Sequence, residues 1–283
     1  MRIVRTLEEL GDALEDADTV GLVPTMGALH EGHLSLIRTA RDECDVLVVS
    51  VFVNPTQFND PADLAAYPSD EPRDAALAEG AGADVFFAPP AEEIYPTGFA
   101  TTVSVSGVSE PLEGAHRGKA HFDGVATVVA KLLIAVAPDV AYFGQKDAQQ
   151  VAVVRRLVAD LALPVEISVC PTVREPDGLA MSSRNVRLAP EDRPRALALK
   201  AGLDAAASAA TEGADPRAAE AAGLAAMRER DVEAEYFAIV DPETFAPADD
   251  LTRPALAVVA ATVDQVRLID NQPIDPIPTQ EAL

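Results

Sequence analysis

Cysteine is scarce in this chain: Cys44 and Cys170 are the only two among 283 residues, and each lies within or beside an apolar run. We therefore expect two small core residues in a reducing compartment and no disulfide. Long apolar runs are lacking as well. No segment approaches the roughly eighteen apolar residues of a membrane span, and the first residues lack the apolar region of a secretory signal. These features predict a soluble, cytoplasmic protein with no membrane partner.

Positive charge is also in short supply. The formal net charge is −24 at pH 7, which argues against a nucleic acid as partner, because phosphate backbones are recognised by lysine and arginine. A bound polyanion would need a local positive pocket, and screening of exposed charges beyond roughly 8 Å makes such a pocket possible. Lysine is rare, so a lysine in a polar turn is a candidate site residue. The lysines are Lys119, Lys131, Lys146 and Lys200.

The first part of the chain alternates between β-rich apolar runs and helical patterns. Such alternation predicts an α/β fold with a Rossmann-like, mostly parallel sheet that has helices on both faces. Ligands of these sheets collect at the carboxyl ends of the strands. The expected strands are 20–24, 45–53, 84–88, 140–143 and 165–169, and the expected helices are 33–42, 71–79, 124–136 and 148–161.

The composition changes after about residue 186. An alanine-rich helical pattern at 193–210 ends before Gly213, and Asp215-Pro216 supplies the N-cap and first-turn proline of a second helix. That helix reaches about residue 230, and we expect an irregular tail after Asn271. The expected strands between them are 234–240, 256–261 and 266–269. We therefore predict a nucleotide- and substrate-binding domain at 1–186 and a small α+β domain at 187–283.

The stretch Met26-Gly-Ala-Leu-His-Glu-Gly-His33 joins the strand at 20–24 to the helical pattern that follows. Free backbone N–H groups and the positive end of the helix dipole gather at such a place and favour an anion such as phosphate. His30 and His33 can donate to phosphoryl oxygens, and Gly27 and Gly32 permit close approach of the backbone. The alternatives are a surface turn with incidental histidines and a metal site. We expect no metal site of the protein itself, because no cluster of cysteines or carboxylates completes one.

Two further polar motifs supply groups that a phosphate site at this turn would lack. Gly144-Gln-Lys-Asp147 follows the strand at 140–143, and its lysine and aspartate could hold a phosphate or Mg²⁺ and a ribose hydroxyl. Met181-Ser-Ser-Arg184 follows a loop rich in Gly, Pro and polar residues, and it offers two hydroxyls and a guanidinium to a triphosphate or a leaving pyrophosphate. The alternatives are an ion-paired turn that opens the next helix and a helix N-cap beside a solvated arginine.

Two glutamines are candidates for contact with a small substrate. Gln57 follows the apolar strand at 45–53, and Gln150 lies one turn into the helix at 148–161. A side-chain amide can bind hydroxyls and carboxylates without adding charge. Taken singly, each glutamine is better explained as a solvent-exposed residue.

In combination these motifs resemble the pantoate–β-alanine ligase (pantothenate synthetase) family of the HxGH nucleotidylyltransferase superfamily. The resemblance covers essentially the whole chain. The long motifs in combination are specific for the family, whereas HxGH alone marks only the superfamily. Ser69, Gln145 and Ala148 differ from the residues that family members usually carry. The matching stretches are 24–34, 51–58, 121–129, 143–147 with Gln150, 171–185 and 268–271.

The resemblance implies an ATP-dependent ligase that acts with Mg²⁺ on pantoate and β-alanine, and it implies a homodimer. It implies catalytic roles for His30, His33 and Lys146, and among them His33 is the implied proton donor. Gln57 and Gln150 are implied to hold pantoate, with Gln57 also meeting β-alanine. The implied ATP site comprises Met26, Gly27, Ala28, Leu29, His30, Glu31, Gly32, His33, Gly144, Gln145, Lys146, Asp147, Val173, Met181, Ser182, Ser183 and Arg184.

Two other functions remain open at this point. A plain nucleotidyltransferase would release its adenylylated product, and a nucleotide-binding regulator would bind ATP without releasing pyrophosphate. An acyl-adenylate hydrolyses in water, so a ligase must close over its intermediate. The segments 59–69 and 174–179 are the candidate lids.

Overall fold

The computed structural model describes residues 1–58, 64, 65 and 67–276. The chain forms two compact units. The first comprises Met1–Gln145 and Gln149–Pro171, and the second comprises Lys146–Ala148 and Thr172–Leu283. This division falls before Thr172, whereas the sequence led us to expect a domain boundary after residue 186.

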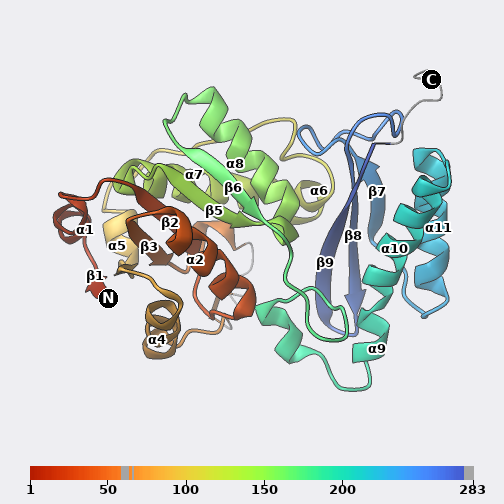
Figure 1. Cartoon of the computed structure of the whole chain (residues 1–283), viewed down its shortest axis with the longest axis horizontal. Coiled ribbons are helices and arrows are strands. Elements are labelled where there is room, and N and C mark those ends of the chain that lie inside the picture. The colour runs from red at the N-terminus through yellow and green to blue at the C-terminus, as the bar shows by residue number, and fades with distance from the viewer. Residues whose placement is uncertain (59–63, 66, 277–283) are drawn as a thin grey trace. The chain divides into compact units, whose positions relative to one another are not determined.

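The first unit is built on a six-stranded sheet in which every pair of neighbours is parallel (Figure 1). The strand order is β1-β4-β3-β2-β5-β6. Five of these strands confirm the expectation from the apolar runs; β1 was not expected, because three residues are too few for a periodic pattern. The strands are β1 (Arg2–Val4), β2 (Val20–Thr25), β3 (Val46–Val51), β4 (Val85–Phe87), β5 (Val140–Gly144) and β6 (Glu166–Cys170).

Helices cover both faces of this sheet. Leu22 and Val23 are neighbours in β2 and point to opposite faces, yet both are completely buried. Helix α2 contacts β2 and α4, while α7 contacts β2 and α1. The helices are α1 (Leu7–Leu14), α2 (Glu31–Glu43), α4 (Glu71–Ala81), α5 (Ala91–Ile94), α6 (Glu113–Arg117), α7 (Lys119–Val136) and α8 (Ala148–Asp160), with short 3₁₀ turns η1 (Pro55–Gln57) and η2 (Gln145–Asp147).

The starts of three helices differ from the sequence expectation. Helix α1 was not expected, although Thr6 and Glu9 form a capping box at its start. Helix α2 begins at Glu31 and not at residue 33, because His30 is its N-cap. Helix α7 begins at Lys119 and not at residue 124, after Gly118 with φ +80°.

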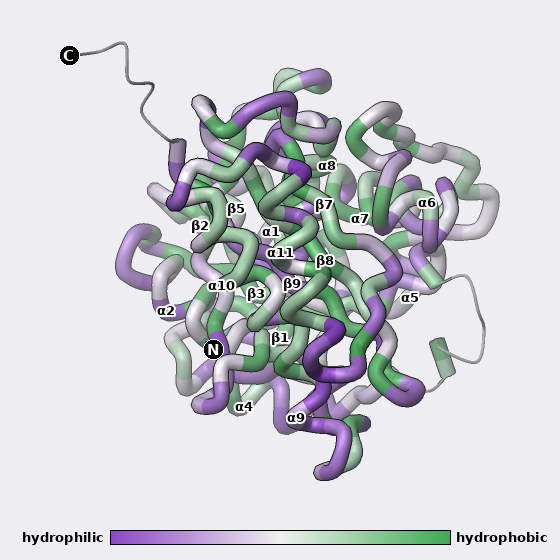
Figure 2. The backbone as a smooth tube through the Cα atoms, turned by 90° about the vertical axis from the view of Figure 1, so that its right-hand side faces the viewer, coloured by the Kyte–Doolittle hydropathy of each residue, from purple (hydrophilic) through white to green (hydrophobic). Residues whose placement is uncertain are grey.

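The second unit is a three-stranded antiparallel sheet with helices, as the α+β pattern predicted. Its sheet order is β7-β8-β9. Eight of the nine residues of β8 are buried, and the hydrophobic colour dominates this strand in Figure 2. The elements are η3 (Ser183–Arg187), α9 (Arg193–Ala196), α10 (Ala198–Thr211), α11 (Pro216–Arg228), β7 (Tyr236–Val240), β8 (Ala255–Val263) and β9 (Val266–Ile274).

Two sequence expectations for this unit hold only in part. The helical pattern at 193–210 is divided into α9 and α10 at Leu197. The tail that was expected to be irregular after Asn271 begins as strand, because β9 pairs with β8 along its full length and ends with Ile274 opposite Ala255. Pro273 is tolerated there because β9 is an edge strand of the sheet.

Both cysteines are free and buried, as expected for core residues. The hydroxyl of Tyr142 donates to the Glu43 carboxylate over 2.7 Å and lies 3.4 Å from the sulfur of Cys44. Burial raises the pKa of Tyr142 and that of the Cys170 thiol. Within the described part of the chain, no helix has the length and hydrophobicity needed to span a bilayer.

The close packing of α10 and α11 depends on glycines. A Cβ on Gly202 would lie 2.8 Å from the side chain of Met227, and a Cβ on Gly223 would lie 2.4 Å from the ring of Phe237 on β7. Phe237 is buried, so its ring has little room to move. Small residues at these two positions therefore let the helix pair approach the sheet.

We predict that Gly223→Ala lowers the free energy of unfolding by about 1–3 kcal/mol, because the new methyl group overpacks the core. The matched control is Gly11→Ala in α1, where an added Cβ meets nothing within 4 Å. That change should raise the free energy of unfolding by about 0.5–1 kcal/mol. Urea denaturation measures both, and an equal gain in the two variants would contradict the packing argument.

Candidate active site

The turn after β2 is held by a buried carboxylate. Gly27 and Ala28 have φ values of 83° and 50°, so the chain reverses sharply before α2 begins. The carboxylate of Asp74 on α4, whose side chain is 1% exposed, accepts hydrogen bonds from the backbone N–H groups of Ala28 over 2.7 Å and Leu29 over 2.8 Å. Asp74 therefore determines the path of the backbone at the centre of the turn.

The backbone donors of this turn are used within the protein. The N–H of Gly27 donates to the hydroxyl of Thr25 over 3.2 Å, and those of Ala28 and Leu29 donate to Asp74. The sequence led us to expect free donors in the first turn of α2, but there the N–H groups of Gly32 and His33 are also bonded, to Nδ1 and to the carbonyl of His30. An anion at this turn would therefore be recognised mainly by side chains.

The two histidines cap α2 and fix each other's orientation. Nδ1 of His30 accepts from the N–H of Gly32 over 3.2 Å, and Nδ1 of His33 accepts from the N–H of His30 over 3.3 Å. Their ring centroids lie 4.1 Å apart at an interplanar angle of 30°. Because each Nδ1 accepts a hydrogen, the proton of each neutral ring lies on Nε2. The pair is thus arranged to donate from Nε2.

Gln57 belongs to a polar cluster at the end of β3. Its amide nitrogen lies 2.9 Å from the sulfur of Met26, and its amide oxygen accepts from Asn54 over 3.0 Å. Asn54 is 1% exposed and also donates to the carbonyl of Gly124 on α7 over 3.1 Å. A Cβ on Gly124 would lie 2.6 Å from the carbonyl oxygen of Thr56. The structure therefore brings two sequence-predicted residues, Gln57 and Met26, into contact.

Gln150 lies on α8 and is half-buried. Its neighbour Gln149 has a structural role: its amide nitrogen donates to the carbonyls of Val108 and Pro111, each over 2.8 Å, and its oxygen accepts from the N–H of Glu113 over 3.1 Å. Gln149 therefore holds the loop before α6. Gln150 is the candidate for substrate contact.

Sequence reasoning missed Asp74, Asn54 and His121. Asp74 had a signal, because it shares the buried face of α4 with Ala78 and Ala81, and a carboxylate on an apolar helix face needs partners. His121, whose Nδ1 lies 2.9 Å from the carbonyl oxygen of Gln57, gave no local signal of that contact.

Lys146 and Asp147 follow β5 in a single 3₁₀ turn, η2. The Lys146 ammonium lies 3.5 Å from the Asp147 carboxylate, and the two side chains are 16% and 50% exposed. The ion-paired turn weighed from the sequence is thus present. The ion pair does not exclude a ligand, because an ammonium has three N–H donors and one carboxylate does not occupy all of them. Gly144 ends β5, and Gln145 opens η2 directly before this pair.

The segment Met181–Arg184 opens the 3₁₀ helix η3. The Ser182 hydroxyl caps it by accepting from the N–H of Arg184 over 3.2 Å, as the N-cap alternative predicted. The N–H of Met181 donates to the carbonyl of Val173 over 2.9 Å, so Val173 and the segment lie side by side. Asn185, which is buried, donates to Glu175 over 2.7 Å and to the carbonyl of Ala180 over 3.0 Å.

The two segments expected as lids differ in what the structure describes. Residues 59–63 and 66 of the first lie outside the described residues. The second begins at Arg174, whose backbone pairs with Ala180. Glu175 and Asp177 within it bind Arg193 over 2.5 Å and 2.8 Å, and Arg193 lowers the pKa of the Asp177 carboxyl. These contacts argue against independent movement of that segment.

Comparison with known proteins gives consistent matches. Residues 2–273 match the model of the family described as pantoate-beta-alanine ligase. The chain is 54% identical over 277 residues to the pantothenate synthetase of Cereibacter sphaeroides (strain ATCC 17029 / ATH 2.4.9), with 96% of this chain and 99% of that protein covered. It is 50% identical over 274 residues to the pantothenate synthetase of Roseiflexus sp. (strain RS-1), covering 96% and 98%.

Solved structures agree with this match. The crystal structure of pantothenate synthetase from Thermus thermophilus is 50% identical, has a TM-score of 0.93, and covers 98% of this chain and all of that one. The pantoate-beta-alanine ligase from Francisella tularensis, complexed with beta-gamma ATP and beta-alanine, is 34% identical with a TM-score of 0.78, covering 96% and 97%.

We predict that Asp74→Asn loosens the turn after β2. The carboxylate has two charged oxygens that each accept one N–H group, whereas an amide has one neutral oxygen and can no longer accept from both in the same way. Loss of one such bond should lower the free energy of unfolding by about 1–3 kcal/mol and speed hydrogen exchange at Ala28 and Leu29. Hydrogen exchange followed by NMR measures this. The matched control is Asp70→Asn at the N-cap of α4, which keeps a good cap; equal acceleration in both variants would refute the role of Asp74.

Proposed function

Because the chain belongs to the pantoate–β-alanine ligase family, we propose that it condenses pantoate with β-alanine to pantothenate in an ATP-dependent, AMP-forming reaction. The observation that carries the proposal is the family match over residues 2–273. It is supported by the solved relative from Francisella tularensis, whose complex contains beta-gamma ATP and beta-alanine.

The reaction has two steps. The carboxylate of pantoate attacks the α-phosphorus of ATP, and the bond to the leaving pyrophosphate breaks to give pantoyl-adenylate. The amine of β-alanine then attacks the acyl carbon and loses a proton to water, and the C–O bond to AMP breaks with its electron pair on AMP. Pyrophosphate is already a good leaving group, so catalysis of the first step depends on alignment and on stabilising negative charge.

His30 and His33 are the proposed donors at the β2–α2 turn. Their orientation supports this role, because capping of α2 leaves each Nε2 protonated. A donor whose direction is fixed before the reaction loses little free energy to reorganisation as charge develops on a phosphoryl oxygen. We assign His33 as proton donor and His30 as its partner in charge stabilisation. Met26, Gly27, Ala28, Leu29, Glu31 and Gly32 line the same ATP-binding turn.

Lys146 and the segment Met181–Arg184 are the proposed partners of the triphosphate. An ammonium, two hydroxyls and a guanidinium suit phosphate oxygens. The net charge of −24 makes such local cations necessary for a polyanionic substrate. The remaining members of the proposed ATP site are Gly144, Gln145, Asp147 and Val173.

Gln57 and Gln150 are the proposed pantoate contacts, with Gln57 also meeting β-alanine. The contact of Gln57 with Met26 supports this assignment, since it links the candidate substrate amide to the ATP-binding turn. A neutral amide suits pantoate because the carboxylate has to remain nucleophilic.

Mg²⁺ enters the proposal as part of the substrate MgATP. The described residues contain no group of three or more His, Cys, Asp or Glu side chains placed to hold a metal. Mg²⁺ is commonly bound through substrate phosphates, water and one or two carboxylates, and Asp147 is the carboxylate nearest in sequence to Lys146. We also propose a homodimer in the cytoplasm, which sedimentation at several protein concentrations and cell fractionation would test.

Coupled assays of AMP and pyrophosphate test the function, with pantoate and β-alanine left out in turn. AMP should form only when both are present, and pyrophosphate release should require pantoate. Release of an adenylylated product as the end point would favour a nucleotidyltransferase. ATP binding without pyrophosphate release under every combination would favour a regulator.

We predict that Lys146→Ala reduces kcat on the order of 100-fold, because loss of one preorganised charge stabiliser raises the barrier by about 3 kcal/mol. Thermal stability should change little. The matched control is Lys200→Ala, which removes a surface ion pair with Asp204 in the same unit and should leave kcat unchanged. Near-normal turnover of the Lys146 variant at saturating ATP would contradict the assigned role.

A further inference from the structure

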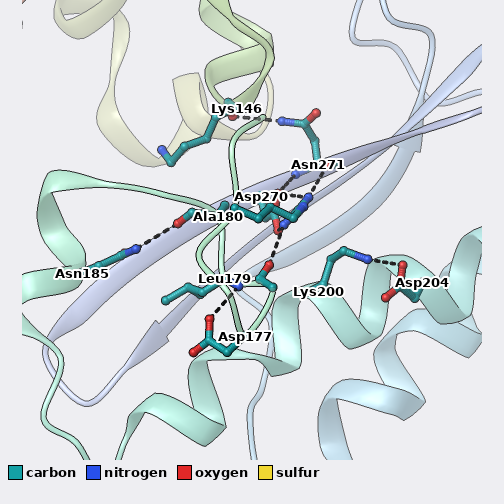
Figure 3. A network of polar contacts seen from close by, with 11 residues as sticks. Lys146, Asp177, Leu179, Ala180, Asn185, Lys200, Asp204, Asp270 and Asn271 are labelled. Carbon is teal, nitrogen blue, oxygen red and sulfur yellow. Dashed lines mark hydrogen bonds and ion pairs between the residues drawn. The ribbon is translucent and has the colours of Figure 1, made fainter. Parts of the chain in front are cut away.

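Strand β9 carries two adjacent polar residues that are buried. Asp270 and Asn271 are each only 4% exposed, and they pair with Val259 and Val258 of β8. Successive residues of a strand point to opposite faces of the sheet. The two side chains therefore reach in different directions, and Figure 3 shows each of them bonded to a different segment of the chain.

Asn271 holds the turn that carries Lys146. Its side-chain nitrogen donates to the backbone carbonyl of Lys146 over 2.9 Å (Figure 3). The bond joins residues 125 positions apart in the sequence, and it acts on the main chain, so the ammonium of Lys146 is not consumed by it. Residues Lys146–Ala148 group with the second compact unit, although β5 before them and most of α8 after them belong to the first.

Asp270 holds the loop that leads into Met181–Arg184. Its carboxylate forms a two-pronged ion pair with Arg174, with N–O distances of 2.6 Å and 3.0 Å. The same guanidinium donates to the carbonyl of Gly178 over 3.1 Å. Because Arg174 pairs with Ala180 through the backbone, the ion pair fixes both ends of the loop directly before Met181.

We propose that Asp270 and Asn271 are positioning residues for the ligase reaction, which set the place of Met181–Arg184 and of the Lys146 backbone relative to each other. The proposal rests on the proposed function, because it assumes that both segments bind the triphosphate. Neither β9 residue touches the reacting atoms in this scheme. Asp270 acts through the loop before Met181, and Asn271 acts through the backbone of Lys146.

The chemistry of the two residues supports positioning over simple stabilisation. A buried ion pair contributes little to net stability compared with well-packed apolar residues of similar volume, because desolvation offsets the attraction. The two-pronged ion pair between Arg174 and Asp270 and the amide of Asn271 do specify geometry, since each hydrogen bond requires one direction of approach. Asp270 lies on the face of β9 that also bears the apolar core residues Val266, Leu268 and Ile274, so its carboxylate has few other places to find a partner.

Asn271→Leu tests the first half of the proposal, since it keeps the volume and removes the donor to Lys146. Turnover should fall at least about tenfold, because a shift of the order of 1 Å in a catalytic group can reduce the rate by a hundredfold. The matched control is Leu268→Ala, which truncates a core residue on the same strand. This change should lower thermal stability at least as much as Asn271→Leu does. Its kcat should stay within about twofold of the wild-type value.

A double-mutant cycle separates positioning from a general structural defect. In single-turnover assays with enzyme in excess, Asn271→Leu should reduce the rate at least about tenfold in the wild-type background and less than about twofold in the Lys146→Ala background. An equal reduction in both backgrounds would overturn the proposal, as would an Asn271 variant with wild-type kcat. A wild-type protein without AMP-forming activity would instead refute the proposed function.

Arg174→Lys tests the second half and remains informative if the Asn271 variant does not fold. It keeps a positive charge opposite the buried carboxylate and removes the two-pronged geometry. The KM for ATP should rise and kcat should fall, each several-fold, while the KM for β-alanine stays near its wild-type value. Unchanged kinetics in a folded Arg174→Lys protein would overturn the role of Asp270.

Discussion

The carboxylate of Asp74 is almost completely buried, and its charge must be compensated by hydrogen bonds where it lies. It meets this requirement with an ion pair to Arg73 and with the N–H groups of Ala28 and Leu29, which are the central residues of the β2–α2 turn. The conformation of the turn directly before His30 follows from the backbone path that these bonds hold. A single buried charge on α4 thus organises the part of the first unit that bears the histidine pair.

The same requirement recurs in the second unit. Asp270 is buried in β9 and pairs with Arg174, and this pair holds the loop before Met181–Arg184. Asn271 next to it holds the backbone of Lys146. In both units, therefore, buried polar groups bind the main chain near the candidate site residues.

This arrangement changes how phosphate recognition is explained at the β2–α2 turn. A helix N-terminus usually offers backbone N–H groups to an anion, but here three of the preceding N–H groups are bonded within the protein. An anion at this turn would then be recognised mainly by the imidazole side chains of His30 and His33. Side chains of this kind can be placed where charge develops in a transition state, which suits a reaction that needs alignment and charge stabilisation more than proton transfer.

The sequence by itself determined the elements with strong local patterns: five strands of the parallel sheet, the main helices and the three strands of the second unit. The His30–His33 geometry is also local, because the two rings cap the helix they begin, and the comparisons confirm the family that the motifs predicted. Only the tertiary structure decided which distant groups satisfy one another. Asp74 is 45 and 46 positions from its partners, and Asn271 is 125 positions from Lys146. Local propensity cannot contain this information, because a buried polar side chain is compensated by whichever backbone or charged group the packed fold brings within hydrogen-bonding distance.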